Sequence, residues 1–109
     1  MDIQEILKKH NLWVRGEAWG SRANLSNANL RGADLRGADL AGANIDFTQL
    51  PLSCKGLHWK IDKKIACQLL YHIGSMTIDD EEFTQFTKSP TFLKLANEFH
   101  RVKECGRLE

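Results

Sequence analysis

The sequence predicts a short solenoid closed by α-helical caps. A five-residue repeat in the middle of the chain indicates the solenoid, and apolar residues at helical spacing on both sides indicate the caps. The expected division is an N-terminal capping helix and loop in residues 1–20, the repeats in 21–53 and a helical region in 54–109. At 109 residues the chain has the length of one typical domain, so all three parts are expected to share one compact domain.

The repeat places an alanine two residues before a leucine or isoleucine in five consecutive groups. The pairs are Ala23 with Leu25, Ala28 with Leu30, Ala33 with Leu35, Ala38 with Leu40, and Ala43 with Ile45. Thr48 and Leu50 form a looser sixth group, and Asn or Asp follows each of the five alanines. A period of five matches neither the face of an α-helix nor the face of a β-strand.

An alanine-rich helix is the alternative interpretation of this segment. Gly32, Gly37 and Gly42 argue against it, because each glycine would cost a helix interior about 1 kcal/mol relative to alanine. The Asn and Asp residues also favour local backbone hydrogen bonds in turns. We therefore expect a turn after every few extended residues, with leucine toward the axis of a coil, alanine filling the interior, and Asn or Asp outside.

The pattern A(D/N)L followed by two variable residues resembles the pentapeptide-repeat family. The resemblance implies a right-handed quadrilateral β-helix with four repeats per coil, so the predicted fold class is mainly β-solenoid with α caps. Coils stacked at about 4.8 Å would place Leu25 under Ile45 and Leu30 under Leu50. About one and a half coils cannot bury their own apolar faces, so the flanking segments are expected to cap them.

The N-terminal segment carries one helix signal. Asp2 fits a helix N-cap, and the helix is expected to end near His10. Trp13 and Trp19 follow in a segment too short to form its own core. We therefore expect both tryptophans to pack against one end of the solenoid.

The C-terminal segment predicts three helices. Capping residues and apolar spacing place them at residues 63–73, at a short acidic helix beginning near Asp80 that carries Phe83 and Phe86, and at residues 90–105 after Ser89. These helices would form the larger body that closes the other end of the solenoid.

Charge and composition name no partner by themselves. The chain has 15 basic and 14 acidic residues, so no overall field favours nucleic acid or an anionic membrane. No secretory signal pattern is present and no apolar run reaches the length of a membrane span. The three cysteines are an odd count without the density of a disulfide scaffold, which agrees with a reducing compartment. We expect a cytoplasmic protein, acting in a bacterial host cytoplasm and not at a membrane.

No catalytic or cofactor site is expected. The four histidines are scattered over the chain, and no recognised catalytic motif is present. Cys67 with His72, and His100 with Cys105, have residue types that suit zinc. A spacing of five on a helix turns the second side chain about 140° away from the first, however, so each pair diverges. We therefore expect no metal, no cofactor and no enzymatic activity.

The resemblance implies a binding protein without catalytic residues. The best-understood members of the family bind type II topoisomerases by imitating the shape and charge of DNA. Here Asp34, Asp39 and Asp46 are balanced by Arg22, Arg31 and Arg36, so the repeat segment is neutral where a DNA mimic should be acidic.

The predicted function is a non-enzymatic protein-binding module. The opening ILKKHNLWVRGE resembles short repeat proteins of phages and mobile elements. This likeness favours a phage-encoded inhibitor of a host bacterial system, such as an anti-CRISPR protein. Three alternatives stay open: a DNA mimic that inhibits a type II topoisomerase, a structural assembly protein, and a nucleic-acid binder that uses Lys55, Lys60, Lys63 and Lys64.

Two groups of charged residues are the candidate partner-binding sites. The repeat surface offers Arg31, Arg36, Asp34 and Asp39, and the start of the acidic helix offers Asp79, Asp80, Glu81 and Glu82. Arginine is enriched among residues that dominate binding energy, and opposite charges on one surface suit a specific protein contact. The expected partner is a protein of a host bacterial complex rather than nucleic acid, and a homodimer is left open.

Overall fold

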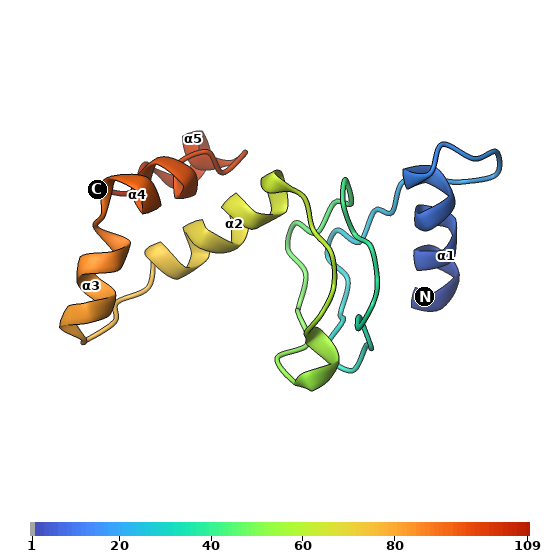
Figure 1. Ribbon diagram of the computed structural model, residues 1–109, viewed down its shortest axis with the longest axis horizontal. Helices are drawn as coiled ribbons and strands as arrows, with labels where there is room; N and C mark the ends of the chain where they lie inside the picture. Colours follow the sequence, from blue (N-terminus) through green and yellow to red (C-terminus); the bar gives the residue numbers. More distant parts are fainter. Residues whose placement is uncertain (1) are drawn as a thin grey trace. The chain divides into compact units, whose positions relative to one another are not determined.

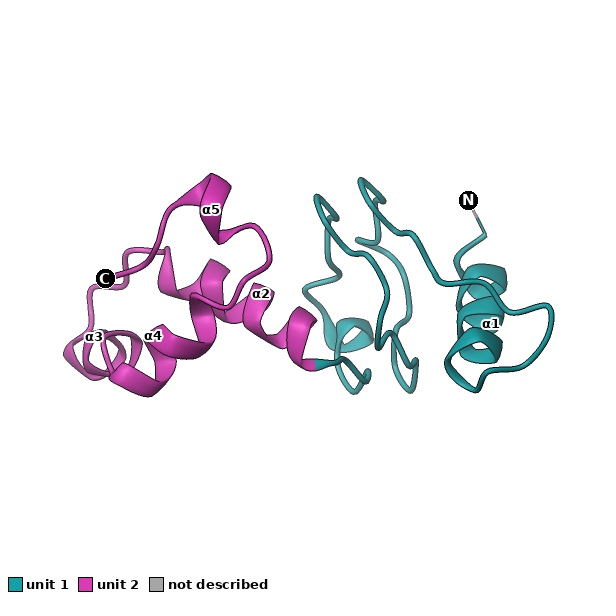
Figure 2. Ribbon diagram, turned by 90° about the horizontal axis from the view of Figure 1, so that it is seen from above, with its two compact units in different colours: residues 1–62 teal, residues 63–109 magenta. Residues whose placement is uncertain are grey.

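The computed structural model describes residues 2–109, which fold into two compact units (Figure 1, Figure 2). The N-terminal unit, residues 1–62, contains α1 (Ile3–Val14), the repeats and one 3₁₀ turn, η1 (Cys54–Gly56). The C-terminal unit, residues 63–109, contains α2 (Lys63–Gly74), α3 (Glu81–Thr87), α4 (Pro90–Ala96) and α5 (Val102–Cys105). None of the helices in the described chain is long and apolar enough to span a bilayer.

The predicted fold class, mainly β-solenoid, is wrong. Residues 2–109 contain helices but no β-strand, and the repeats are turns joined by isolated parallel β-bridges. The bridges pair Asn24 with Asn44, Asn29 with Gln49, and Asp39 with Lys60. Each repeat spends the four residues from its leucine to the next alanine in a hydrogen-bonded turn. Only the Asn or Asp position is left to form a bridge, so the bridges stay one residue long and do not extend into strands.

Two hydrogen bonds fix each repeat. The backbone N–H groups of Ala28, Ala33, Ala38 and Ala43 donate to the carbonyl of the leucine three residues earlier, at 2.9–3.0 Å. At the Asn or Asp position, the side-chain Oδ1 accepts from the backbone N–H two residues later, at 2.9–3.1 Å, in all five repeats. These are Asx turns, which mimic a backbone turn. The requirement for Asn or Asp at every fifth residue therefore comes from the turn.

Two passes of the chain lie side by side through the repeats. The backbone N–H of Leu25 donates to Asn44 O, and that of Leu30 to Gln49 O, both at 2.8 Å. Residues 54–62, which the sequence grouped with the helical region, continue the pairing, because Leu40 N–H donates to Lys60 O at 2.8 Å. The N-terminal unit therefore extends past the last recognisable repeat.

The core of the N-terminal unit consists of the repeat leucines. Leu25, Leu30, Leu35 and Leu40 are fully buried, and Ala23 and Ala43 are buried beside them. Three side chains of α1, Ile3, Ile6 and Leu7, pack against this cluster, and Figure 2 shows α1 beside the two passes. Asp2 caps α1 as predicted, since its carboxylate accepts from the N–H groups of Gln4 and Glu5. The helix runs to Val14, however, and not only to the region of His10.

The C-terminal unit has four helices where the sequence predicted three. Tyr71, Phe92, Ala96 and Phe99 form its core, and α2 packs against α4. The last predicted helix is split, because α4 ends at Ala96. The buried side chain of Asn97 bonds the backbone of Leu108 twice: Nδ2 donates to Leu108 O at 2.9 Å, and Oδ1 accepts from Leu108 N–H at 2.7 Å. This bonding favours a bend that brings the C-terminal segment back over Asn97.

Three glycines of the repeats predict a graded series of stability changes. A Cβ at Gly32 meets nothing and the backbone there is not left-handed, so Gly32→Ala should be neutral or stabilise by about 0.4–1 kcal/mol. Gly37 has a φ of +77° but open space, so alanine should cost about 1–2 kcal/mol. Gly42 combines a φ of +83° with a Cβ position 2.8 Å from Trp13 Cζ3, so its alanine variant should cost the most.

The series can be followed by tryptophan fluorescence in urea. All three tryptophans, Trp13, Trp19 and Trp59, lie in the N-terminal unit, so their signal reports unfolding of that unit alone. Equal midpoints for the three alanine variants would contradict the turn assignment.

Candidate functional site

Asp34 and Arg36 of the repeat surface form a two-point ion pair. Arg36 Nη2 lies 2.7 Å from Asp34 Oδ2, and Arg36 Nε donates to Asp34 Oδ1 at 2.9 Å. The bond from the Arg36 side chain, together with the bond from the Arg36 backbone N–H, lowers the pKa of Asp34 to about 2. The same bond raises the pKa of Arg36. The two charges therefore offset each other, and the pair holds one fixed orientation on the surface.

Arg31 keeps an unopposed charge. Its backbone N–H and its Nε both donate to Asn29 Oδ1, at 3.1 and 3.2 Å. No carboxylate among residues 2–109 forms an ion pair with it. Asp39, by contrast, accepts from Ala41 N–H at 3.0 Å and lies 3.8 Å from Lys60 Nζ. Of the four candidates on the repeats, Arg31 is thus the one whose charge is available to a partner.

The second candidate group, residues 79–82, lies in the C-terminal unit at the start of α3. Asp80 is its N-cap and accepts from Phe83 N–H at 3.0 Å, while Glu81 accepts from Gln85 Nε2 at 3.3 Å. Within the described chain the carboxylates of Asp79 and Glu82 make no hydrogen bond or ion pair. The acidic run therefore has two structural members and two whose charges face solvent.

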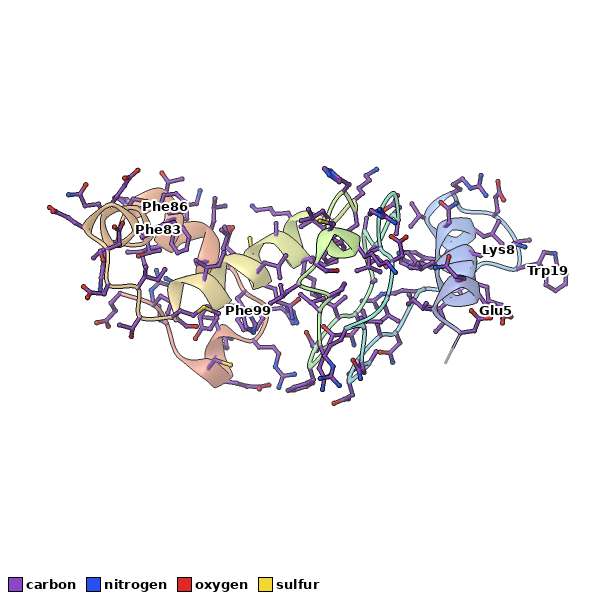
Figure 3. The ribbon with its side chains drawn as sticks, turned by 90° about the horizontal axis from the view of Figure 1, so that it is seen from below. Glu5, Lys8, Trp19, Phe83, Phe86 and Phe99 are labelled. Atoms are coloured by element: carbon purple, nitrogen blue, oxygen red, sulfur yellow. The ribbon has the colours of Figure 1, made fainter. Side chains whose placement is uncertain are left out.

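Two aromatic residues, Trp19 and Phe47, are exposed and have left-handed backbones, which the sequence did not predict. Trp19 has a φ of 70° and is 92% exposed, and Figure 3 shows it projecting into solvent from the loop after α1. The prediction that Trp19 packs as part of the cap is wrong, whereas Trp13 does pack, with its ring close to Gly42 and stacked on His10. Phe47 has a φ of 63° and is 65% exposed. Bulky residues rarely adopt this conformation, and such outliers cluster at functional sites.

The five-residue register carries a further signal that was available in the sequence. The positions two residues after Leu25, Leu30, Leu35, Leu40 and Ile45 all lie in turns. In the first pass that position holds small or polar residues, Asn27, Gly32, Gly37 and Gly42, whereas in the second it holds the exposed Phe47. Leu52 and Leu57 continue the five-residue spacing outside these turns, and both are exposed. Leu52 is 99% exposed. The second pass therefore presents large apolar groups where the first has none.

The four lysines of the nucleic-acid alternative do not form an unopposed basic face. Lys60 lies beside Asp39, and Lys63 Nζ lies 3.3 Å from Glu98 Oε2. Lys55 and Lys60 belong to the N-terminal unit, and Lys63 and Lys64 to the C-terminal unit. Half of their charge is already balanced by carboxylates, so the observations do not favour this alternative.

The cysteine and histidine pairs show no metal geometry. Cys67 is buried, its Sγ lies 3.9 Å from Glu98 Oε2, and burial followed by the nearby Glu98 charge raises the pKa of its thiol. His72 Nδ1 is bonded to Gln68 O at 2.8 Å, and Cys105 is exposed. In residues 2–109 no three His, Cys, Asp or Glu side chains are grouped so that they could hold a metal ion.

One comparison with known proteins identifies the repeats. The family model of pentapeptide repeats matches residues 21–53, with eight copies. No curated protein and no solved structure matches the chain. Proteins with this repeat are generally non-enzymatic, and the repeat suggests a protein-interaction module. Residues 21–53 of this chain are therefore a run of pentapeptide repeats.

Proposed function

We propose that this protein is a non-enzymatic binding module that holds a protein partner on the surface of its repeats. The observation that carries the proposal is the fixed geometry of the repeat surface. Each Asn or Asp side chain of the five repeats accepts a bond from the backbone N–H two residues later, and each turn is closed by a backbone bond. Little conformational entropy is lost when a partner binds a surface that is already ordered, which favours affinity.

Arg31 is the proposed centre of this surface. Its guanidinium is oriented by Asn29 but opposed by no carboxylate among the described residues. The Asp34–Arg36 pair lies one repeat further along and offers a donor and an acceptor in a fixed orientation. Asp39 completes the set one repeat later. Arginine at the centre of a rigid surface is typical of residues that dominate binding energy.

The biological role we propose is inhibition of a host bacterial system by a phage-encoded protein acting in the host cytoplasm. The likeness of the opening segment to short repeat proteins of phages, together with the small size of the chain, supports this role. Bacterial immunity, such as a CRISPR effector complex, is the proposed target. A small protein can block a large complex by covering one functional surface of about 800 Å².

Capture from a bacterial lysate, followed by mass spectrometry, would identify the partner. With the identified partner, the double variant Arg31→Glu/Arg36→Glu should bind at least about tenfold more weakly than the parent, because it reverses two charges on the proposed surface. Its melting temperature should change little, since exposed charges add little stability. Arg31→Glu alone should weaken binding more than Arg36→Glu, because Arg36 is already paired with Asp34.

The matched control is Lys8→Glu/Lys94→Glu, which changes the net charge equally at two exposed lysines outside the repeats. This control should bind the partner as the parent does. Equal weakening by both double variants would show that binding follows net charge rather than the repeat surface. Unchanged binding in Arg31→Glu/Arg36→Glu, with loss of binding after charge reversal of residues 79–82, would assign recognition to α3.

A further inference from the structure

The C-terminal unit exposes its large apolar side chains in one stretch of the chain. Among the described residues 63–109, the exposed large hydrophobic side chains are Ile73, Met76, Phe83 and Phe86. Two of them, Phe83 and Phe86, are three residues apart on α3 and are therefore neighbours on one helix face (Figure 3). They are 53% and 55% exposed. We call this face of Phe83 and Phe86 the α3 face.

The α3 face is held in place on one side and open on the other. The ring of Phe86 packs edge-on against Phe92 of α4, with centroids 5.1 Å apart. The helix itself is fixed by Asp80 at its start and contacts α4. Anchored aromatic side chains that keep half of their surface in water gain free energy when a partner covers them.

Charge decides which partner suits the α3 face. Four consecutive acids, residues 79–82, lead into the helix, and the carboxylates of Asp79 and Glu82 are unpaired within residues 2–109. The nearest base that follows, Lys88, donates to the carbonyl of Glu109 at 2.9 Å. A second copy docking on this face by two-fold symmetry would bring two such acidic runs together, which costs free energy. An anionic lipid surface would be repelled for the same reason.

We propose that the α3 face binds an amphipathic helix of another protein, with apolar residues on one side and lysines or arginines at its edge. The apolar side would cover Phe83 and Phe86, and the basic edge would meet Asp79 and Glu82. This is the mode in which a helix lays its apolar face on a hydrophobic surface and opposite charges set its orientation. The inference rests on the proposed function only in that the protein acts by binding another protein, and it concerns a different surface.

The test uses the full chain and a labelled synthetic peptide that forms a helix with leucines on one face and lysines on the other. Fluorescence anisotropy at low salt should show saturable binding. Phe83→Ser should weaken it by about tenfold or more, because an aromatic anchor is lost. Asp79→Asn/Glu82→Gln, which spares the capping Asp80, should weaken binding by about threefold and reduce its dependence on salt.

Two controls distinguish peptide binding at the α3 face from non-specific binding to other apolar or charged surfaces. Leu52→Ser removes a fully exposed apolar side chain from the N-terminal unit and should leave peptide binding unchanged. A peptide with glutamates in place of the lysines should not bind. Circular dichroism checks that Phe83→Ser keeps its helices. If Phe83→Ser loses helix, the Asp79→Asn/Glu82→Gln variant alone tests the α3 face.

Several outcomes would overturn the inference. The inference is wrong if the peptide still binds both Phe83→Ser and Asp79→Asn/Glu82→Gln as it binds the parent. It is also wrong if Leu52→Ser weakens peptide binding as much as Phe83→Ser does. A dimer seen by sedimentation that dissociates in Phe83→Ser would also overturn it. Binding of the chain to lipid vesicles that is lost in Phe83→Ser would overturn it too. Arg31→Glu/Arg36→Glu should bind the peptide as the parent does. The two proposals can therefore fail independently. Evidence against peptide binding at the α3 face says nothing about partner binding at the repeat surface, and the reverse also holds.

Discussion

Leu35→Ala should destabilise the N-terminal unit by about 2–5 kcal/mol. Leu35 is fully buried among the other repeat leucines, and its backbone N–H donates to Lys55 O at 2.8 Å. The turns on either side are closed by bonds that include Ala33 N–H and Ala38 N–H, so the backbone cannot collapse into the space that the side chain leaves. Tryptophan fluorescence in urea should show a lower midpoint for the variant.

The matched control for this prediction is Leu52→Ala. It removes the same atoms from the same part of the chain, but Leu52 faces solvent. An exposed substitution away from special features changes stability by no more than about 0.5 kcal/mol. Equal midpoints for Leu35→Ala and Leu52→Ala would contradict the leucine core.

The local structure of the repeats follows from the sequence, but the fold class does not. Period five with Ala, Asn or Asp, and Leu predicted the turns and the buried leucines, and both are observed. The step from these turns to β-strands was wrong, because it needed more than one bridging residue per repeat. Residues 54–62 were also missed, since they pair with the first pass through backbone groups and carry no alanine and leucine signature.

Helix starts were easier to predict than helix ends. Asp2, Asp80 and Ser89 each cap a helix through a side-chain bond to a backbone N–H, and each is a residue type that favours the N-cap. The ends at Val14 and Ala96 were missed. Asn97, which follows the end of α4 at Ala96, bonds to the backbone of Leu108. These two residues are too far apart in sequence for a local pattern to reveal the contact.

The candidate site was predicted in part. Charged residues on the repeats are visible in the sequence, but which of them pair depends on geometry: Asp34 pairs with Arg36, while Arg31 bonds to the neutral Asn29. Trp19 was expected to be packed and Phe47 was not singled out, because the residue type does not reveal that either has a left-handed backbone or an exposed side chain. Asn27 and Phe47 occupy equivalent turn positions with nearly equal φ, and only Asn is a residue that favours it.

The sequence did not predict the structural role of His10. It is completely buried in α1, and its ring joins that helix to the repeats. Ala23 N–H donates to Nδ1 at 2.9 Å, and Nε2 lies 2.8 Å from Ala41 O. A backbone N–H can only donate and a carbonyl oxygen can only accept, so the hydrogen of the neutral ring must be on Nε2. One imidazole thus satisfies two backbone groups of the first pass.

His10→Phe should destabilise the N-terminal unit strongly, because the ring keeps its size but leaves Ala23 N–H and Ala41 C=O without their partner. Each buried group left unpaired costs about 1–3 kcal/mol, and the N–H is the more costly of the two because Ala23 is buried whereas Ala41 is only partly so. His10→Gln is the informative companion, since its amide has an oxygen that can accept from Ala23 N–H and an NH2 group that can donate to Ala41 O, but no ring to stack on Trp13. The urea midpoint followed by tryptophan fluorescence should therefore fall further for His10→Phe than for His10→Gln. The opposite order would mean that ring packing against Trp13, rather than the two hydrogen bonds, fastens α1 to the repeats.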